Sequence, residues 1–204
     1  MPEAISEYIP QVARDEGSAR RWRRARLGWA AAVGLAGGLL ALIVGAPLLR
    51  AGGMEAAAGA VYGAFALLCH QMDGRSFHLL GFKLAVCARC FGLYAGALLG
   101  ALVYPLARPL ARRDLPWRGW LLAAAVPTTV DFALGFFGVW ENTHASRFLT
   151  ASLLGVVVAF YFVPGVVDLA LTPRNQLFGR RRDPRPELPN FLPTEGVDGH
   201  ERQI

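Results

Sequence analysis

Charged residues are scarce in this 204-residue sequence. Asp, Glu, Lys and Arg make up 18% of it, whereas hydrophobic residues make up 54%. A soluble domain carries about 25% charged residues, because its surface has to be solvated. The mean hydropathy of +0.35 agrees with this deficit. The composition therefore excludes an ordinary soluble domain and indicates a small integral membrane protein.

The charge that is present lies at the flanks of apolar segments. The net charge is +6, and of the 21 Lys and Arg residues six lie before residue 27, four within residues 108–118 and six after residue 173. A nucleic-acid-binding surface would instead interleave basic residues with polar or aromatic ones on one folded domain. Membrane topology and anionic lipid explain the placement better, so no nucleic-acid partner is expected.

Four apolar runs are long enough to cross a bilayer as helices. The first, residues 27–49, holds 23 uncharged positions, about 34 Å of helix against a hydrocarbon core of about 30 Å. The apolar part of a signal peptide would be shorter. The other three runs are residues 91–107, 119–140 and 148–171. The sequence therefore predicts an all-α polytopic membrane protein with four transmembrane helices.

A fifth apolar run, residues 56–68, has only 13 residues and favours a short re-entrant or interfacial helix. With four spans, 16 of the 21 basic residues share the cytoplasmic side with both termini, as the positive-inside rule requires. Five spans would move the basic loop 108–118 and the tail outside. Six spans, with residues 76–86 also crossing, would separate Cys69 from Cys87.

The predicted organisation has three parts. A basic cytoplasmic N-terminal segment covers residues 1–26, the transmembrane domain covers residues 27–172, and a basic, proline-rich cytoplasmic tail covers residues 173–204. The tail has few apolar residues to bury, so we expect it to be disordered.

Cysteine is absent outside one stretch, residues 69–90. Cys69 is followed directly by His70, and sixteen residues later comes the motif Cys87-Ala-Arg-Cys90. A C-x-x-C turn holds two thiolates together, and a loop of this length can bring back a second pair, which suits a tetrahedral ion. Zinc is the predicted cofactor, held by these two pairs in a cap on the non-cytoplasmic side.

A redox interpretation competes with the metal. An outward-facing Cys87-x-x-Cys90 pair with Cys69 as the exchanging partner would suit a membrane thiol-disulfide oxidoreductase. Arg89 between the two cysteines would favour a thiolate. Packing of cysteines as small hydrophobic residues is the third interpretation, and the clustering of all three cysteines argues against it.

The role of the predicted metal depends on its fourth ligand. Four protein ligands would make the site structural, whereas three would leave a position open for catalysis, as in a lipid-active metalloenzyme. His78 or His144 could replace His70 as a ligand. Asp131, near the middle of the third span, and His144 are the catalytic candidates. Whether the protein is an enzyme stays open at this point.

Several polar residues on the predicted outer side are candidates for binding an anion. Gln71, Arg75 and Arg89 lie around the cysteines, and Asn142 and Arg147 lie near the start of the last span. Cations that escape the positive-inside preference can bind phosphate or carboxylate groups, although snorkelling and pairing with acidic residues compete. Besides the lipid bilayer, we therefore expect an anionic or lipid-derived small molecule as a partner.

The stretch CHQMDGRSFHLLGFKLAVCARCFGLYAGALLG resembles the signature of the domain of unknown function 2085 family of small prokaryotic membrane proteins. The later stretch PTTVDFALGFFGVWENTHASRFLTASLLG resembles the second half of that family. The motif positions are taken by Cys69, His70, Gln71, Arg75, Ser76, Cys87, Arg89, Cys90, Asp131, Asn142 and Arg147.

The likeness covers roughly residues 55–170, and its departures are Phe91 in place of Thr and Phe132 and Ala151 in place of Gly. These departures concern helix packing rather than the cysteines. The resemblance implies a prokaryotic inner-membrane protein and a shared site, but it implies no particular reaction.

Overall fold

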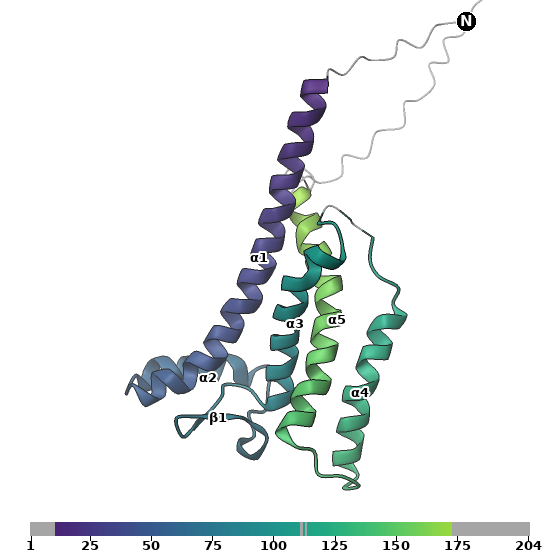
Figure 1. The fold of residues 1–204 in the computed structure, drawn as a ribbon. Coiled ribbons are helices and arrows are strands. Elements are labelled where there is room, and N and C mark those ends of the chain that lie inside the picture. Colours follow the sequence, from purple (N-terminus) through teal and green to yellow (C-terminus); the bar gives the residue numbers. More distant parts are fainter. Residues whose placement is uncertain (1–10, 111, 113, 173–204) are drawn as a thin grey trace, which may run out of the picture. The chain divides into compact units, whose positions relative to one another are not determined.

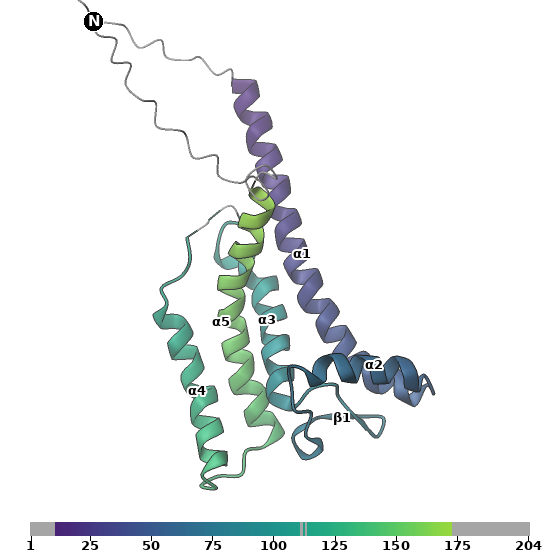
Figure 2. The same cartoon turned by 180° about the vertical axis from the view of Figure 1, so that it is seen from behind.

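The computed structural model describes residues 11–110, 112 and 114–172. Helices dominate it, with a small hairpin between the second and third helices (Figures 1 and 2). The elements are α1 (Gln11–Ala51), α2 (Glu55–Ala66), η1 (Asp73–Arg75), β1 (His78–Leu79), β2 (Phe82–Lys83), α3 (Ala88–Ala107), α4 (Gly119–Phe136) and α5 (His144–Leu171). The predicted tail, residues 173–204, lies outside the described residues.

Four described helices are long and apolar enough to cross a membrane, namely α3, α4, α5 and the part Ser18–Ala51 of α1. This confirms the all-α polytopic prediction. Helix α1 begins within the predicted N-terminal segment, and α3 and α5 begin three and four residues earlier than the apolar runs. A helix can extend past its apolar run because its backbone groups stay paired internally while charged side chains reach the interface. Arg89 and Arg147 consequently lie in the first turns of α3 and α5.

A glycine turn reverses the chain between α1 and α2. Gly53 has a positive φ of 77°, and the Met54 N–H donates to the Leu49 carbonyl at 2.9 Å. This is the hydrogen bond of a Schellman C-cap, in which glycine takes the left-handed conformation. The 12 residues of α2 then extend about 18 Å. That length is too short for a crossing, in agreement with the predicted short helix.

Residues 76–86 form a hairpin, which rules out the six-span arrangement. Strands β1 and β2 pair antiparallel through His78 with Lys83 and Leu79 with Phe82. The two turn residues, Leu80 and Gly81, have φ of 52° and 82°, as the tight two-residue turns of hairpins require. The chain therefore returns to the end of the helices that it left after α1.

We call this end the cap end. It comprises the C-terminal ends of α1 and α4, the N-terminal ends of α3 and α5, and residues 67–87 (Figure 1). A buried apolar cluster attaches residues 84–86 and Cys69 to α1 and α2. Its members are Ile43, Ala46, Phe65, Cys69, Leu84, Ala85 and Val86. Burial of this cluster fixes the cap against the spans.

Helices α3 and α5 pack with their backbones in close contact. A Cβ atom added at Gly92, Gly96 or Gly100 would lie 2.3, 2.1 or 2.6 Å from a carbonyl oxygen of α5. Small residues spaced by four allow such an approach within a membrane. The contact sets the position of Arg89 and Cys90 relative to Arg147.

Helix α4 packs mainly against α5. It ends at Phe136, four residues before the predicted end, where Gly138 takes a positive φ of 67° and the Val139 N–H donates to the Leu134 carbonyl at 3.0 Å. After a short loop, Thr143 caps α5, because its hydroxyl oxygen accepts the Ser146 N–H at 3.0 Å.

Candidate metal centre and cationic pocket

The three cysteines meet at the cap end. Their sulfur atoms all lie within 4.8 Å of one another. Cys69 follows α2 and is buried, Cys87 directly precedes α3, and Cys90 lies in the first turn of α3. Thiolates around a tetrahedral zinc ion are about 3.8 Å apart, given Zn–S bonds of about 2.3 Å. The cluster thus fits three ligands of such an ion with small adjustments.

Local electrostatics favour a thiolate at Cys87. The Cys87 N–H donates to the Cys69 sulfur at 3.2 Å. A hydrogen bond from the Cys90 thiol lowers the Cys87 pKa to about 5, against the opposing effect of burial, and Cys69 contributes to the lowering. A thiolate is the form of cysteine that binds metals and attacks disulfides. The surroundings of Cys87 therefore favour the form of the thiol that binds metals.

The histidines that were predicted as possible ligands have different surroundings. His70 is exposed, adjoins Cys69 and borders the same pocket, but the group of three sulfurs does not include it. His78 pairs with Asp73 at 3.3 Å, and the His144 ring packs 5.5 Å from that of Phe77. Of the four predicted ligands, the structure brings three together and leaves His70 at their side.

A pocket of about 490 Å³ opens beside the cysteines. Its walls come from the cap, α3, α4 and α5, and its lining residues are Leu68, Cys69, His70, Gln71, Met72, Arg75, Cys87, Arg89, Cys90, Phe132 and Arg147. All predicted metal ligands and four of the five predicted anion-binding residues border this one cavity. Asn142 is the exception.

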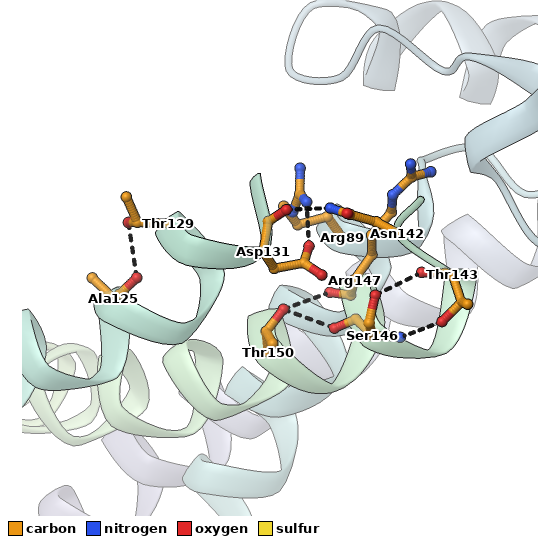
Figure 3. A network of polar contacts seen from close by, with 9 residues as sticks. All are labelled: Arg89, Ala125, Thr129, Asp131, Asn142, Thr143, Ser146, Arg147 and Thr150. Carbon is orange, nitrogen blue, oxygen red and sulfur yellow. Dashed lines mark hydrogen bonds and ion pairs between the residues drawn. The ribbon is translucent and has the colours of Figure 1, made fainter. Parts of the chain in front are cut away.

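Asn142 belongs instead to a polar network behind the pocket (Figure 3). Its side-chain amide donates to the backbone carbonyl of Asp131. The Asp131 carboxylate, which is 8% exposed, accepts a hydrogen bond of 2.5 Å from the Arg89 guanidinium. That guanidinium also lies over the ring of Phe132, 5.4 Å from its centre. The network therefore positions Arg89 at the pocket wall.

The two catalytic candidates do not line the pocket. Asp131 is engaged by Arg89, and His144 packs against Phe77 with its Nε2 atom buried and unpaired. Their catalytic assignment therefore stays a prediction. Asp131 links α4 to the start of α3, and His144 packs the start of α5 against Phe77 of the cap.

Gln71 holds the loop that follows Cys69. Its side-chain amide donates to the backbone carbonyl of Tyr62 at 2.7 Å, and its backbone carbonyl accepts from Lys83 Nζ at 2.8 Å. The Tyr62 hydroxyl donates in turn to the Lys83 carbonyl at 2.5 Å. Gln71 has a positive φ of 48°, which these contacts maintain. Its side chain is thus occupied in fixing the cap as well as bordering the pocket.

The apolar part of the pocket was not predicted from the sequence. Leu68, Met72 and Phe132 line it, and they come from two separate segments, the loop after α2 and helix α4. No sequence pattern distinguishes them from neighbouring apolar residues, because their common position depends on how α2, the cap and α4 fold together.

Fold and site together define a polytopic helical membrane protein with a three-cysteine cluster beside an arginine-lined pocket. Residues 69–161 match the model of the family described as "Predicted membrane protein (DUF2085)". The chain belongs to this family.

Two archaeal relatives illustrate the likeness. "Uncharacterized protein MJ1492" of Methanocaldococcus jannaschii is 40% identical over 104 residues, which are 51% of this chain and 67% of the relative. An "Uncharacterized protein" of Methanothermobacter thermautotrophicus is 31% identical over 98 residues, or 47% of this chain and 84% of the relative. No solved structure matches the chain.

Proposed function

We propose that this protein is a zinc-binding membrane protein whose cysteine cluster fastens the cap to the spans at the non-cytoplasmic surface. The observation that carries the proposal is the meeting of all three cysteines within 4.8 Å. Cys69 belongs to the cap side, whereas Cys87 and Cys90 belong to the start of α3. One ion bound by all three would therefore join two segments separated by the hairpin.

The free energy of zinc binding is large compared with the stability of a small cap. Structural zinc sites in small peptides have apparent binding free energies of about 10–16 kcal/mol at neutral pH. The cap itself contains two strands of two residues and one 3₁₀ turn, which supply few hydrogen bonds. When bound, zinc would supply a fixed positive centre for the three thiolates.

The fourth ligand decides whether the site is closed. His70 adjoins the cluster and supports a closed, structural site. If His70 does not bind, the remaining position belongs to water or to a molecule in the pocket, the arrangement of a lipid-active metalloenzyme. We assign His70 as the fourth ligand, because it is the histidine that borders the pocket with the three cysteines.

Metal analysis of the detergent-purified protein tests this proposal. We expect about one zinc per chain, and Cys87→Ser should weaken retention against a chelator by more than 10–100-fold, the loss that outer-shell substitutions alone cause. Met72→Leu is the matched control, because Met72 carries sulfur and borders the pocket without belonging to the cluster. It should retain zinc. His70→Ala should speed zinc loss if His70 closes the site.

A thiol-disulfide oxidoreductase is the second candidate, favoured by the lowered pKa of Cys87 within a C-x-x-C motif. Mass spectrometry after thiol alkylation separates the two functions. Three alkylated cysteines after metal removal support the zinc site. A Cys87–Cys90 disulfide in protein purified without reductant, together with no bound zinc, contradicts it and supports the redox function.

A further inference from the structure

The basic residues at the cap end concentrate around one cavity. Five Lys and Arg residues lie between the first span and the last outside the basic segments, namely Arg50, Arg75, Lys83, Arg89 and Arg147. Three of these five line the pocket beside the cysteines. In contrast, Arg50 pairs with Glu55 and Lys83 donates to the Gln71 carbonyl.

The pocket arginines have too few acidic partners. Asp131 pairs with Arg89, and among the described residues no carboxylate forms an ion pair with Arg75 or Arg147. Arg147 is close enough to Arg75 and Arg89 for electrostatic repulsion, which the more distant attraction of Asp131 and Cys87 opposes without an ion pair. Asp73, two residues before Arg75, is engaged by His78. Three guanidinium groups and one carboxylate leave two positive charges at the cavity.

The backbone adds positive potential in the same place. Arg89 and Arg147 lie in the first turns of α3 and α5, and neither helix has an acidic residue in its first turn. Helix N-termini carry partial positive charge and favour anions over cations. Asp131 compensates for Arg89 there, whereas Arg147 lies where a cation is disfavoured unless an anion in the cavity compensates for it.

The metal proposed above sets the charge of that anion. A divalent ion bound by three thiolates carries one net negative charge, since ligating cysteines are deprotonated. Combined with the two positive charges at the cavity, this leaves one positive charge. A singly charged anion balances the site, whereas a dianion would exceed it.

The apolar walls of the cavity favour an anionic group that carries an apolar part. Leu68, Met72 and Phe132 line it with exposed fractions of 71%, 49% and 51%. Leu68 and Met72 lie in the loop between α2 and η1, and Phe132 lies in the C-terminal part of the span α4, so the cavity borders the membrane, where lipid headgroups meet the hydrocarbon core. Arginine is also the residue best suited to grip phosphate oxygens in pairs.

We infer that Arg75, Arg89 and Arg147 bind a singly charged phosphodiester, of the kind found in phospholipid headgroups, beside the cysteine cluster. This inference deepens the proposed function and rests on it for the charge count. Arg75 and Arg147 hold the phosphate oxygens, and Phe132 and Leu68 contact the apolar part of the ligand.

Native mass spectrometry of the delipidated full chain tests the inference. We expect one phosphatidylglycerol per chain, and uncharged diacylglycerol should not be retained. Arg75→Gln and Arg147→Gln should each weaken phosphatidylglycerol binding about tenfold, the effect of losing one charge-assisted contact. Arg50→Gln is the matched control and should bind like the wild type. Arg147→Lys, which keeps the charge, should bind between wild type and Arg147→Gln.

Two further probes define the ligand. If soluble glycerophosphoglycerol displaces the lipid, the headgroup alone is sufficient for binding. If it does not displace the lipid, the ligand is a phosphodiester attached to a lipid. Both results support a phosphodiester. Phosphatidic acid that binds tenfold tighter than phosphatidylglycerol overturns the single-charge assignment. Equal lipid binding by wild type, Arg75→Gln and Arg147→Gln overturns the site.

Zinc content measured on the same samples separates the two proposals. One zinc per chain with no arginine-dependent lipid overturns the phosphodiester site and leaves the zinc proposal standing. Arginine-dependent lipid binding without zinc overturns the zinc proposal and supports the anion site.

Discussion

The pair Arg89–Asp131 connects the pocket wall to the third span. Asp131 lies on α4 with 8% exposure of its side chain, and Arg89 is 24% exposed. A carboxylate within a span is costly unless it finds a partner in the protein. The pair satisfies that need, and it orients a guanidinium that sits between two of the cysteines in sequence.

We expect Asp131→Asn to destabilise the protein, because it leaves the half-buried Arg89 without its counter-charge. Loss of one partner of a buried pair costs about 3–5 kcal/mol, and the partial exposure of Arg89 reduces this to about 2–4 kcal/mol. Thermal unfolding in detergent measures the change. Asp114→Asn is the control, because the Arg112–Asp114 pair is exposed and contributes about 0–1 kcal/mol. Equal shifts for both variants would contradict a special role for Asp131.

At the residue scale, the sequence predicted which side chains gather but not what each one contacts. The four predicted metal ligands and Gln71, Arg75, Arg89 and Arg147 share one cavity. Motif spacing and charge placement carry that information. The engagement of Asp131 by Arg89 and of His144 by Phe77 depends on the packing of α3, α4 and α5, which spacing along the chain does not encode.

Among the elements, α3 and α5 form the framework on which the site is built. Their glycine-lined contact carries the first turns that hold Arg89, Cys90 and Arg147. Because the backbones touch, the contact has no flexible side chain that could make room for a larger residue.

Gly96→Ala should therefore destabilise the protein by about 1–3 kcal/mol, as overpacking does. The new Cβ would lie 2.1 Å from the Ser152 carbonyl oxygen. Gly38→Ala should instead stabilise the protein. Nothing lies within 4 Å of a Cβ there, and alanine is favoured over glycine in a helix by about 1 kcal/mol. Unfolding temperatures of both variants in the same detergent test the prediction. Stabilisation by Gly96→Ala would contradict the close contact.

The boundaries of elements were the weaker part of the prediction. Apolar length correctly indicated four spans and one short helix. It placed the starts of α3 and α5 too late, because it counts only apolar residues, whereas the helices continue through Arg89 and Arg147. Because these extra residues are helical, Arg89 and Arg147 line the pocket from the N-terminal turns of α3 and α5.

For the whole molecule, the distribution of basic residues determines the predicted orientation. Arg20, Arg24 and Arg26 lie in the N-terminal part of α1, and Arg108 and Arg118 flank the connection between α3 and α4. These positions are at the end opposite the cap end (Figure 2). The positive-inside rule therefore predicts that the cap end faces away from the cytoplasm.

Reporter insertions test this orientation. An alkaline phosphatase inserted in the hairpin turn at Gly81 should be active, because that enzyme requires the oxidising exterior. The same reporter placed at Asp114 should be inactive. A fluorescent protein fused to the C-terminus should fluoresce, consistent with a cytoplasmic tail. Activity at Asp114 combined with inactivity at Gly81 would reverse the topology and place the cysteines in the cytoplasm.

The sequence by itself determined that this is a four-span membrane protein with one concentrated cysteine site, because hydrophobic length, charge placement and cysteine spacing are local properties of the chain. Only the tertiary structure decided that three sulfurs and three arginines border a single cavity. Their meeting depends on long-range contacts, namely the glycine-mediated approach of α3 to α5 and the burial of residues 84–86 against α1 and α2.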